Sequence, residues 1–163
     1  NLLDIIVRST ISRRFFMLYY KNGRFRMDSV YYELPDGVYI DTEFQSVIAT
    51  GFEIVDPEGC FRIHIKGEHW DENSYEFFEK IIFPFGYERL GKIEPVENNG
   101  MHGHKLWYQD SKFNYVEYRF DLPKGGKHAN ISIILKADNA TIPLSELETV
   151  PTFVLLMSTL RPE

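Results

Sequence analysis

A short turn sequence between two apolar runs constrains the fold of this chain more than any other feature. The turn is Asp56-Pro57-Glu58-Gly59, in which proline suits the second turn position and glycine suits the fourth. It predicts a β-hairpin, within residues 51–68, in which Val55 faces Cys60 and Glu53 faces Arg62. The second strand alternates apolar and basic residues, with Phe61, Ile63 and Ile65 on one face and Arg62, His64 and Lys66 on the other. We therefore expect one face of the hairpin to be buried and the other to be partly exposed to solvent.

The chain after this hairpin predicts a helix, further strands and a second helical segment. Apolar residues recur at helical spacing up to Phe85, after the candidate capping residues Asp71 and Asn73, and Pro84 ends the pattern. Period-two alternation then predicts a second hairpin and another strand, and prolines at first-turn positions predict a C-terminal helix. These elements are expected at residues 105–110, 115–122, 130–136 and 141–160.

The N-terminal region combines a tight turn with an uneven distribution of charge. Residues 1–12 have the pattern of a short amphipathic helix. Asn22-Gly23 supplies the two positive φ angles of a type I′ turn, which predicts a hairpin over residues 15–27 with Tyr20 opposite Phe25. Both faces of its first strand are apolar or aromatic, so we expect one face to be covered by another surface. Residues 8–27 contain no acid and six basic residues: Arg8, Arg13, Arg14, Lys21, Arg24 and Arg26.

The order of these elements predicts the fold class. Hairpins that alternate with helices favour an α+β fold with an antiparallel β-sheet flanked by helices, an α/β/α sandwich. The length of 163 residues and the apolar fraction of 44% suit one domain over residues 1–163 with its own core. Within it, residues 1–30 are a candidate N-terminal extension or basic hairpin.

The bulk composition narrows the classes of partner and compartment. The net charge of −6 disfavours nucleic acid, and no apolar run approaches the roughly 18 residues of a membrane span. Cys60 is the only cysteine, so an intrachain disulfide and a thiolate metal cluster are excluded. The absence of disulfides favours a reducing compartment such as the cytoplasm, while the start at Asn1 leaves a removed export signal open. No residue pattern indicates a cofactor.

Several short motifs occur in an order that is found in a known family. They are LPDGV at residues 34–38, the turn at residues 56–59 with its following helix, NGMHG at residues 99–103 leading into KLWY, and the terminal helix at residues 153–160. In this order they resemble the PsbP-like family, which includes an extrinsic subunit of photosystem II, a Ran-binding nuclear transport factor and many small bacterial proteins. The resemblance covers the chain from Tyr31 onward. Because members mostly bind proteins or hold assemblies together, it implies a binding module and assigns no catalytic residue.

One local cluster has residue types that occur in metal sites. His102-Gly103-His104 is expected in a glycine-flanked loop, where two imidazoles could ligate a metal if His64 or His69 and a carboxylate approached. A metal-dependent hydrolase that uses this loop is therefore the alternative function. The other interpretation is a polar loop whose glycines permit a tight backbone, and we assign no residue as a metal ligand.

The residues expected to contact a partner are aromatic, imidazole and basic side chains. Tryptophan is enriched at interface hot spots, and Trp107 shares a strand face with Lys105 and Gln109. The basic hairpin is interpreted as a solvated basic face that pairs with acidic neighbours in the fold, or as a membrane-facing patch, or as a partner surface that contacts an acidic protein or a second copy of this acidic chain. No nucleophile elbow and no phosphate-binding loop occur in the sequence. The sequence thus predicts a non-catalytic protein-binding or assembly module whose binding residues are Trp70, His102, His104, Trp107, Arg14 and Arg26.

Overall fold

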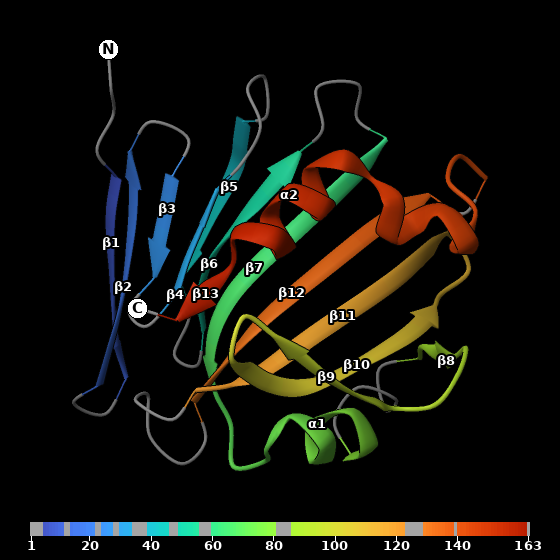
Figure 1. Ribbon diagram of the computed structural model, residues 1–163, viewed down its shortest axis with the longest axis horizontal. Helices are drawn as coiled ribbons and strands as arrows, with labels where there is room; N and C mark the ends of the chain where they lie inside the picture. Colours follow the sequence, from blue (N-terminus) through green and yellow to red (C-terminus); the bar gives the residue numbers. More distant parts are fainter. Residues whose placement is uncertain are drawn as a thin grey trace.

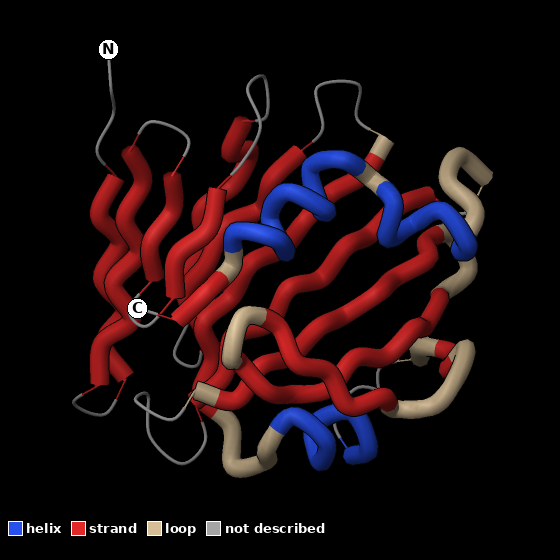
Figure 2. The backbone as a smooth tube through the Cα atoms, in the orientation of Figure 1, coloured by secondary structure: helices blue, strands red, loops and turns tan. Residues whose placement is uncertain are grey.

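In the computed structural model, strands are the dominant elements of the described chain (Figure 2). The described residues are 5–11, 14–21, 24–27, 30–33, 39–45, 49–55, 60–80, 86–122, 129–138 and 140–162. Side chains are described from Glu53 onward within these ranges, except those of Val55 and His69. None of the described helices is long and apolar enough to cross a membrane.

The first four strands and the last strand of the chain form one antiparallel sheet (Figure 1). The register predicted for the N-terminal hairpin is confirmed, because Tyr20 pairs with Phe25 and Tyr19 with Arg26. Its turn, residues 22–23, lies outside the described residues. In order across the sheet the strands are β1 (Ile5–Ile11), β2 (Arg14–Lys21), β3 (Arg24–Met27), β4 (Val30–Glu33) and β13 (Arg161–Pro162).

The helix predicted for residues 1–12 is wrong where the structure describes this segment. Residues 5–11 form β1, which pairs along its whole length with β2, from Ile5 opposite Tyr20 to Ile11 opposite Arg14. The segment is rich in β-branched residues, which favour extended backbone. Pairing with a neighbouring strand therefore overrides a weak helical periodicity.

A larger antiparallel sheet contains the central hairpin and the remaining strands. This sheet, with a few helices packed on it, confirms the α+β class. Its strands, in order, are β5 (Tyr39–Gln45), β6 (Ala49–Val55), β7 (Phe61–His69), β12 (Ala129–Asp138), β11 (Phe113–Asp121), β10 (Met101–Gln109) and β8 (Glu88–Arg89), and β9 (Glu94–Asn98) also pairs with β10.

The central hairpin forms, but its register differs from the prediction by two residues. Glu53 lies opposite His64 instead of Arg62. The connection between β6 and β7 includes Cys60 and is longer than the predicted turn, whose residues 56–59 lie outside the described part. Since the shift is an even number of residues, every side chain keeps its predicted face. The apolar face of β7 is buried as expected.

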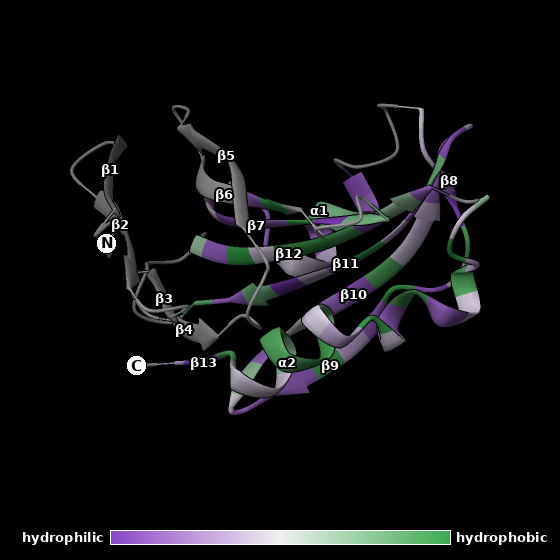
Figure 3. Ribbon diagram, turned by 90° about the horizontal axis from the view of Figure 1, so that it is seen from above, coloured by the Kyte–Doolittle hydropathy of each residue, from purple (hydrophilic) through white to green (hydrophobic). Residues whose placement is uncertain are grey.

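Helices pack on both faces of the larger sheet (Figure 3). The 3₁₀ helix η3 (Leu144–Thr149) and helix α2 (Pro151–Thr159) cover the main core, where Ile63, Ile133 and Leu156 are fully buried. Helix α1 (Ser74–Lys80) covers a smaller aromatic core on the opposite face. The predicted C-terminal helix is therefore two short helices, and Pro151 starts the second one as expected.

The start of α1 and the turn before β10 both follow from local sequence. Asn73 caps α1: its Oδ1 accepts a hydrogen bond from the Glu76 backbone N–H at 2.9 Å, and Glu76 Oε2 accepts one from the Asn73 N–H at 3.2 Å. Residues 81–85 of the predicted helix lie outside the described part. Strand β9 ends at Asn98 and is followed by a two-residue turn, with Asn99 at φ 49° and Gly100 at φ 85°.

Candidate functional site

A groove of about 500 Å³ lies between the edge strand β9 and helix α2. Strand β9, at the edge of the larger sheet beside β10, lies close to α2 (Figure 3). Val154 on α2 borders the groove and is 50% exposed, which makes it one of two large apolar side chains that are exposed in the described part of the chain. The groove is lined by Val96, Glu97, Asn98, Tyr118, Glu148, Phe153, Val154 and Met157.

The turn between β9 and β10 fastens one wall of the groove to the other. The Asn98 amide nitrogen donates hydrogen bonds to the carbonyl oxygens of Met157 at 3.0 Å and of Leu160 at 3.1 Å. The amide nitrogen of Asn99 donates to the carbonyl oxygens of Leu160 at 2.8 Å and Ser158 at 3.2 Å. The last carbonyl groups of a helix have no partner within the helix, so these two amides satisfy them. The groove is thereby held in one shape.

A polar cluster beside the groove ties η3 to the sheet. The Tyr118 hydroxyl donates a hydrogen bond to the Glu148 carboxylate. Lys105 Nζ lies 3.4 Å from Glu148 Oε1 and 3.6 Å from Glu94 Oε2. Burial, and then the hydrogen bond to Glu148, raise the pKa of Tyr118, so its hydroxyl stays a neutral donor.

The groove combines an apolar wall with an acidic rim. Phe153 is buried at its base, and Val96 and Met157 are half-buried along its sides. The rim carries the carboxylates of Glu97 and Glu148, and the ammonium group of Lys105 beside Glu148 is shared with Glu94. Negative charge is therefore in excess, and a ligand with an apolar group next to a positive charge complements both features.

The edge strand β9 disfavours binding by addition of another strand. Pro95 has no backbone N–H to donate, and Glu94 and Glu97 place charges along the strand. Binding in this groove would therefore depend on side-chain contacts with α2 and β9.

The histidine cluster predicted to lie in a loop is part of strand β10. His102 is exposed, and His104 is half-buried on the same face of the strand. Gly103 is needed because a Cβ atom there would overlap the backbone carbonyl of Arg119 on β11. Among the residues that the structure describes, no three histidine, cysteine, aspartate or glutamate side chains form a group that could hold a metal ion.

His104 joins a serine and an aspartate at the start of α1. Ser74 Oγ lies 2.6 Å from Asp121 Oδ2 and 2.7 Å from His104 Nδ1, and the Ser74 backbone N–H donates to Asp121 Oδ1 at 2.9 Å. The serine has one hydroxyl proton, which it donates to the carboxylate, so we infer that His104 Nδ1 carries the proton in their contact. Burial lowers the pKa of His104, and the charge of Asp121 opposes this shift. Ser74 is fully buried at the first position of α1, and its hydroxyl donates to a carboxylate, so this arrangement differs from that of an activated nucleophile.

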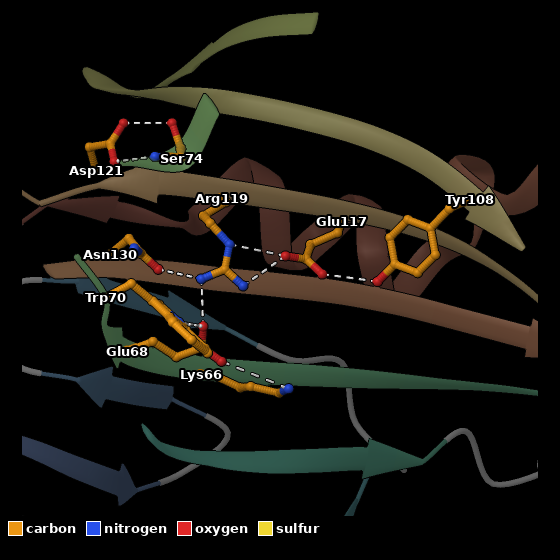
Figure 4. A network of polar contacts seen from close by, with 9 residues as sticks. All are labelled: Lys66, Glu68, Trp70, Ser74, Tyr108, Glu117, Arg119, Asp121 and Asn130. Atoms are coloured by element: carbon orange, nitrogen blue, oxygen red, sulfur yellow. Dashed lines mark hydrogen bonds and ion pairs between the residues drawn. The ribbon is translucent and has the colours of Figure 1, made fainter. Parts of the chain in front are cut away.

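A buried ionic network lies beneath α1 and contains Arg119, which is 1% exposed (Figure 4). Arg119 Nη1 lies 2.5 Å from both Glu68 Oε2 and Asn130 Oδ1, and its Nε and Nη2 donate to Glu117 Oε2 at 3.0 and 2.8 Å. Glu117 Oε1 accepts a further hydrogen bond from the Tyr108 hydroxyl at 2.9 Å. Each buried charge is thus paired and hydrogen-bonded.

Trp70, predicted as a binding residue, is half-buried and belongs to this network. Its Nε1 donates to Glu68 Oε2 at 2.7 Å, and its ring contacts Phe77 edge-on at 5.1 Å between centroids. Phe77 also lies over the Arg119 guanidinium, with 3.5 Å from Cζ to the ring centroid. Trp70 and Phe77 therefore cover the network on the side of α1.

The network shifts the pKa values of its members. Burial acts to raise the pKa of Glu68. The charges of Arg119 and Lys66 act in the opposite direction, as do the hydrogen bonds from Arg119 and Trp70. Together they outweigh burial, so the pKa of Glu68 is lowered. Burial acts to lower the pKa of Arg119, and the charges of Glu68 and Glu117 raise it overall. Burial and then the Glu117 charge raise the pKa of Tyr108. The groups are therefore held as carboxylate, guanidinium and neutral phenol.

The remaining predicted binding residues do not gather at one place in the described structure. Trp107 is half-buried and packs against the main core, next to Lys105, whose Nζ lies 5.7 Å from the ring centroid. Arg14 and Arg26 belong to β2 and β3, and their side chains lie outside the described part.

The groove could not be predicted from local sequence, because its two walls are about sixty residues apart in the chain. One signal was present: Asn99-Gly100 is the same type of turn sequence that correctly predicted the N-terminal hairpin.

The chain matches no family of known proteins, no curated protein and no solved structure.

Proposed function

We propose that this chain is a non-catalytic protein-binding module, and that the groove between β9 and α2 takes a segment of a partner protein. The segment would carry an apolar side chain next to a lysine or arginine. The observation that carries this proposal is Val154, an exposed apolar residue beside a groove with an acidic rim. An exposed apolar side chain next to a concave surface is typical of an interaction site.

Charge complementarity supports a basic segment as the occupant. Glu97 is exposed at the rim. Lys105 neutralises Glu148 only partly, because Glu94 also lies within 4 Å of that lysine. A basic residue of a partner would neutralise part of this negative charge. The net negative charge of the whole chain would also attract a basic partner.

The rigidity of the groove supports the same proposal. Asn98 and Asn99 hold the end of α2, and the Tyr118–Glu148 hydrogen bond holds η3. A preformed groove loses little conformational freedom on binding, so a short segment would bind without large rearrangement.

The resemblance to PsbP-like proteins is consistent with this function, since members of that family mostly bind proteins. We propose that the helices on both sides of the larger sheet correspond to the α/β/α sandwich of that family. The arrangement of α1 and α2 on opposite faces supports this assignment.

Fluorescence anisotropy with short labelled peptides would test the proposed function. A peptide with leucines between lysines is expected to bind, and peptides with glutamates for the lysines or serines for the leucines are expected not to bind. Val154→Ser should weaken binding about tenfold through the lost apolar contact, and Glu97→Gln about two- to fivefold through the lost charge.

Glu146→Gln is the matched control, because it removes an exposed carboxylate on η3 that does not line the groove. Equal binding of all three peptides, or equal weakening by Glu97→Gln and Glu146→Gln, would contradict the proposed function.

A further inference from the structure

The turn that joins β9 to β10 contains a chemically labile dipeptide, Asn99-Gly100. Asparagine is a thermolabile residue type, and its side-chain amide is attacked most easily when the next residue is glycine, which has no side chain in the way. Both residues are exposed. Among the described residues, only the chain neighbours of Gly100 come within 4 Å of the place where its Cβ atom would be. Water and base can therefore reach this peptide bond.

The reaction of such a dipeptide is an intramolecular ring closure followed by hydrolysis. The backbone nitrogen of Gly100 loses its proton and attacks Cγ of the Asn99 side chain, and the side-chain nitrogen leaves as ammonia. Water then opens the five-membered succinimide ring at one of its two carbonyl groups. The product is aspartate or isoaspartate, so the net change is one water molecule gained and one ammonia molecule lost.

In the folded chain both reacting groups are held by hydrogen bonds. The Gly100 backbone N–H donates to Glu97 Oε1 at 2.6 Å. The Asn99 side-chain nitrogen donates to the carbonyl oxygens of Leu160 at 2.8 Å and Ser158 at 3.2 Å, which occupies both of its hydrogens. Ring closure needs the nitrogen and Cγ to meet at short distance in the correct orientation. The two groups must therefore leave these partners before they can react.

Conversion of Asn99 replaces a hydrogen-bond donor by an acceptor at the same position. A carboxylate oxygen then stands where the amide nitrogen contacted the carbonyl oxygens of Ser158 and Leu160. These carbonyl groups lie at the C-terminal end of α2, where the helix dipole is negative and repels a carboxylate. The isoaspartate form also adds one carbon atom to the backbone of the turn. Either product prevents the contact from forming again.

We propose that Asn99 is a modification site, where spontaneous deamidation is slowed by the contact with the end of α2 and makes the loss of that contact permanent. Local opening of the helix end exposes the dipeptide to the reaction, and the product keeps the helix end open. The site is independent of the proposed function, because the conversion and its effect on the fold are both measured without a ligand in the groove.

Peptide mapping by mass spectrometry of the whole chain, incubated at pH 8, tests the protection. Deamidation exchanges NH₂ for OH, and fragmentation of the tryptic peptide of residues 93–105 separates Asn99 from Asn98. We expect the folded wild type to convert Asn99 at least about tenfold more slowly than the same chain unfolded in guanidinium chloride, because only molecules with an open helix end react. Equal rates in the two states would overturn the proposal.

Two variants show whether the end of α2 provides this protection. Asn98→Ala removes two other hydrogen bonds to the same helix end and leaves both reacting groups in place. Glu94→Ala is the matched control, because Glu94 is an exposed residue of the same tryptic peptide and contacts Lys105. Each variant is compared with its own unfolded chain, which corrects for the changed local sequence. Folded Asn98→Ala should convert about threefold faster or more, and Glu94→Ala like the wild type. The same protection in Asn98→Ala as in the wild type would overturn the proposal.

Asn99→Asp represents the product and tests its effect on the fold. At pH 7 this variant should lower Tm by roughly 3–6 °C. Asn99→Gly should lower it less, because it removes the donor without placing a charge beside the helix end. The proposal is also overturned if Asn99→Asp is as stable as Asn99→Gly, since the product would then not keep the helix end open.

Discussion

The amide nitrogen of Asn98 donates a hydrogen bond to the carbonyl oxygen of Leu160 at 3.1 Å, across more than sixty residues of sequence. This contact joins the β9–β10 turn to the end of α2 and so connects the two walls of the groove. Asn98→Ala should lower the free energy of unfolding by about 1–2 kcal/mol, since the Met157 carbonyl group loses this donor and the Leu160 carbonyl group keeps only the Asn99 amide. Urea denaturation measures this change.

The variant for comparison is Asn99→Gly. It keeps the positive φ angle of the turn and removes the Asn99 side-chain amide, while the Asn98 amide stays. Asn98→Ala should also weaken the basic peptide, because the groove loses its fixed shape. If Asn98→Ala binds the peptide with wild-type affinity, the hydrogen bonds from Asn98 to the end of α2 have no part in binding.

The two faces of the central strand β7 should respond differently to truncation. Ile63 is fully buried in the main core, so Ile63→Ala should cost roughly 2–5 kcal/mol of stability. Arg62 is 43% exposed and forms an ion pair with the half-buried Glu53, so Arg62→Ala should cost less than about 1 kcal/mol. Chemical denaturation of both variants compares them, and the reverse order would mean that the faces are assigned wrongly.

Removing Arg119 should be the most damaging single change in the buried network. Arg119→Met leaves the Glu117 carboxylate buried without a cation and leaves Glu68 with only Lys66, whose Nζ lies 3.9 Å away, which should cost about 3–5 kcal/mol. Adding Glu68→Gln and Glu117→Gln to this variant should restore part of the loss, because the uncompensated charges are then gone. Guanidinium denaturation of the single and triple variants is the measurement, and a triple variant less stable than Arg119→Met would refute the charge argument.

His64 should make stability fall as the solution becomes acidic. Burial, and then the charge of Lys66, lower the pKa of His64 from 6.5 to about 4 in the folded chain. Between these two values the unfolded chain binds more protons than the folded one, so stability decreases as the pH falls from 6.5 toward 4 and is fully present above 6.5. The shift corresponds to about 3 kcal/mol.

Denaturation curves between pH 4 and pH 7 in chloride buffer, without phosphate or acetate, measure this dependence. His64→Gln should reduce the slope of the curve over this range, and His104, whose pKa burial also lowers, should account for part of the slope that remains. Glu68 contributes in a different window: because its pKa is lowered, its share of stability is lost as the pH falls through and below its ordinary value. An unchanged slope in His64→Gln would assign the pH dependence to other groups.

The basic N-terminal strands β1, β2 and β3 are a candidate for the segment that enters the acidic groove of a second copy of this chain. In that case the wild-type chain associates at low salt, and Arg14→Glu Arg26→Glu remains monomeric. Sedimentation velocity at low and high salt measures this, since exposed charge pairs weaken as ionic strength rises. If both proteins are monomers at every salt concentration, the partner in the groove is a different protein.

Local sequence determined those features that depend on a few adjacent residues. The Asn22-Gly23 signal determined the register of β2 and β3, from Leu18 opposite Met27 to Lys21 opposite Arg24. Asn73 and Glu76 determined the start of α1, and Pro151 the start of α2. Period-two alternation determined which residues of β11 and β12 enter the main core. In each case the physical cause lies within one turn of chain or one pleat.

Tertiary structure decided everything that depends on which segments meet. Glu117 and Arg119 alternate with apolar residues and have the pattern of a solvent-facing strand edge, yet both are 1% exposed because α1 covers that face. Residues 5–11 became a strand because β2 was available to pair with them. The two walls of the groove are joined by Asn98 and Asn99, whose amides contact the end of α2. Such contacts join residues that are far apart in the chain, and their free energy comes from burial and pairing that local sequence patterns do not contain.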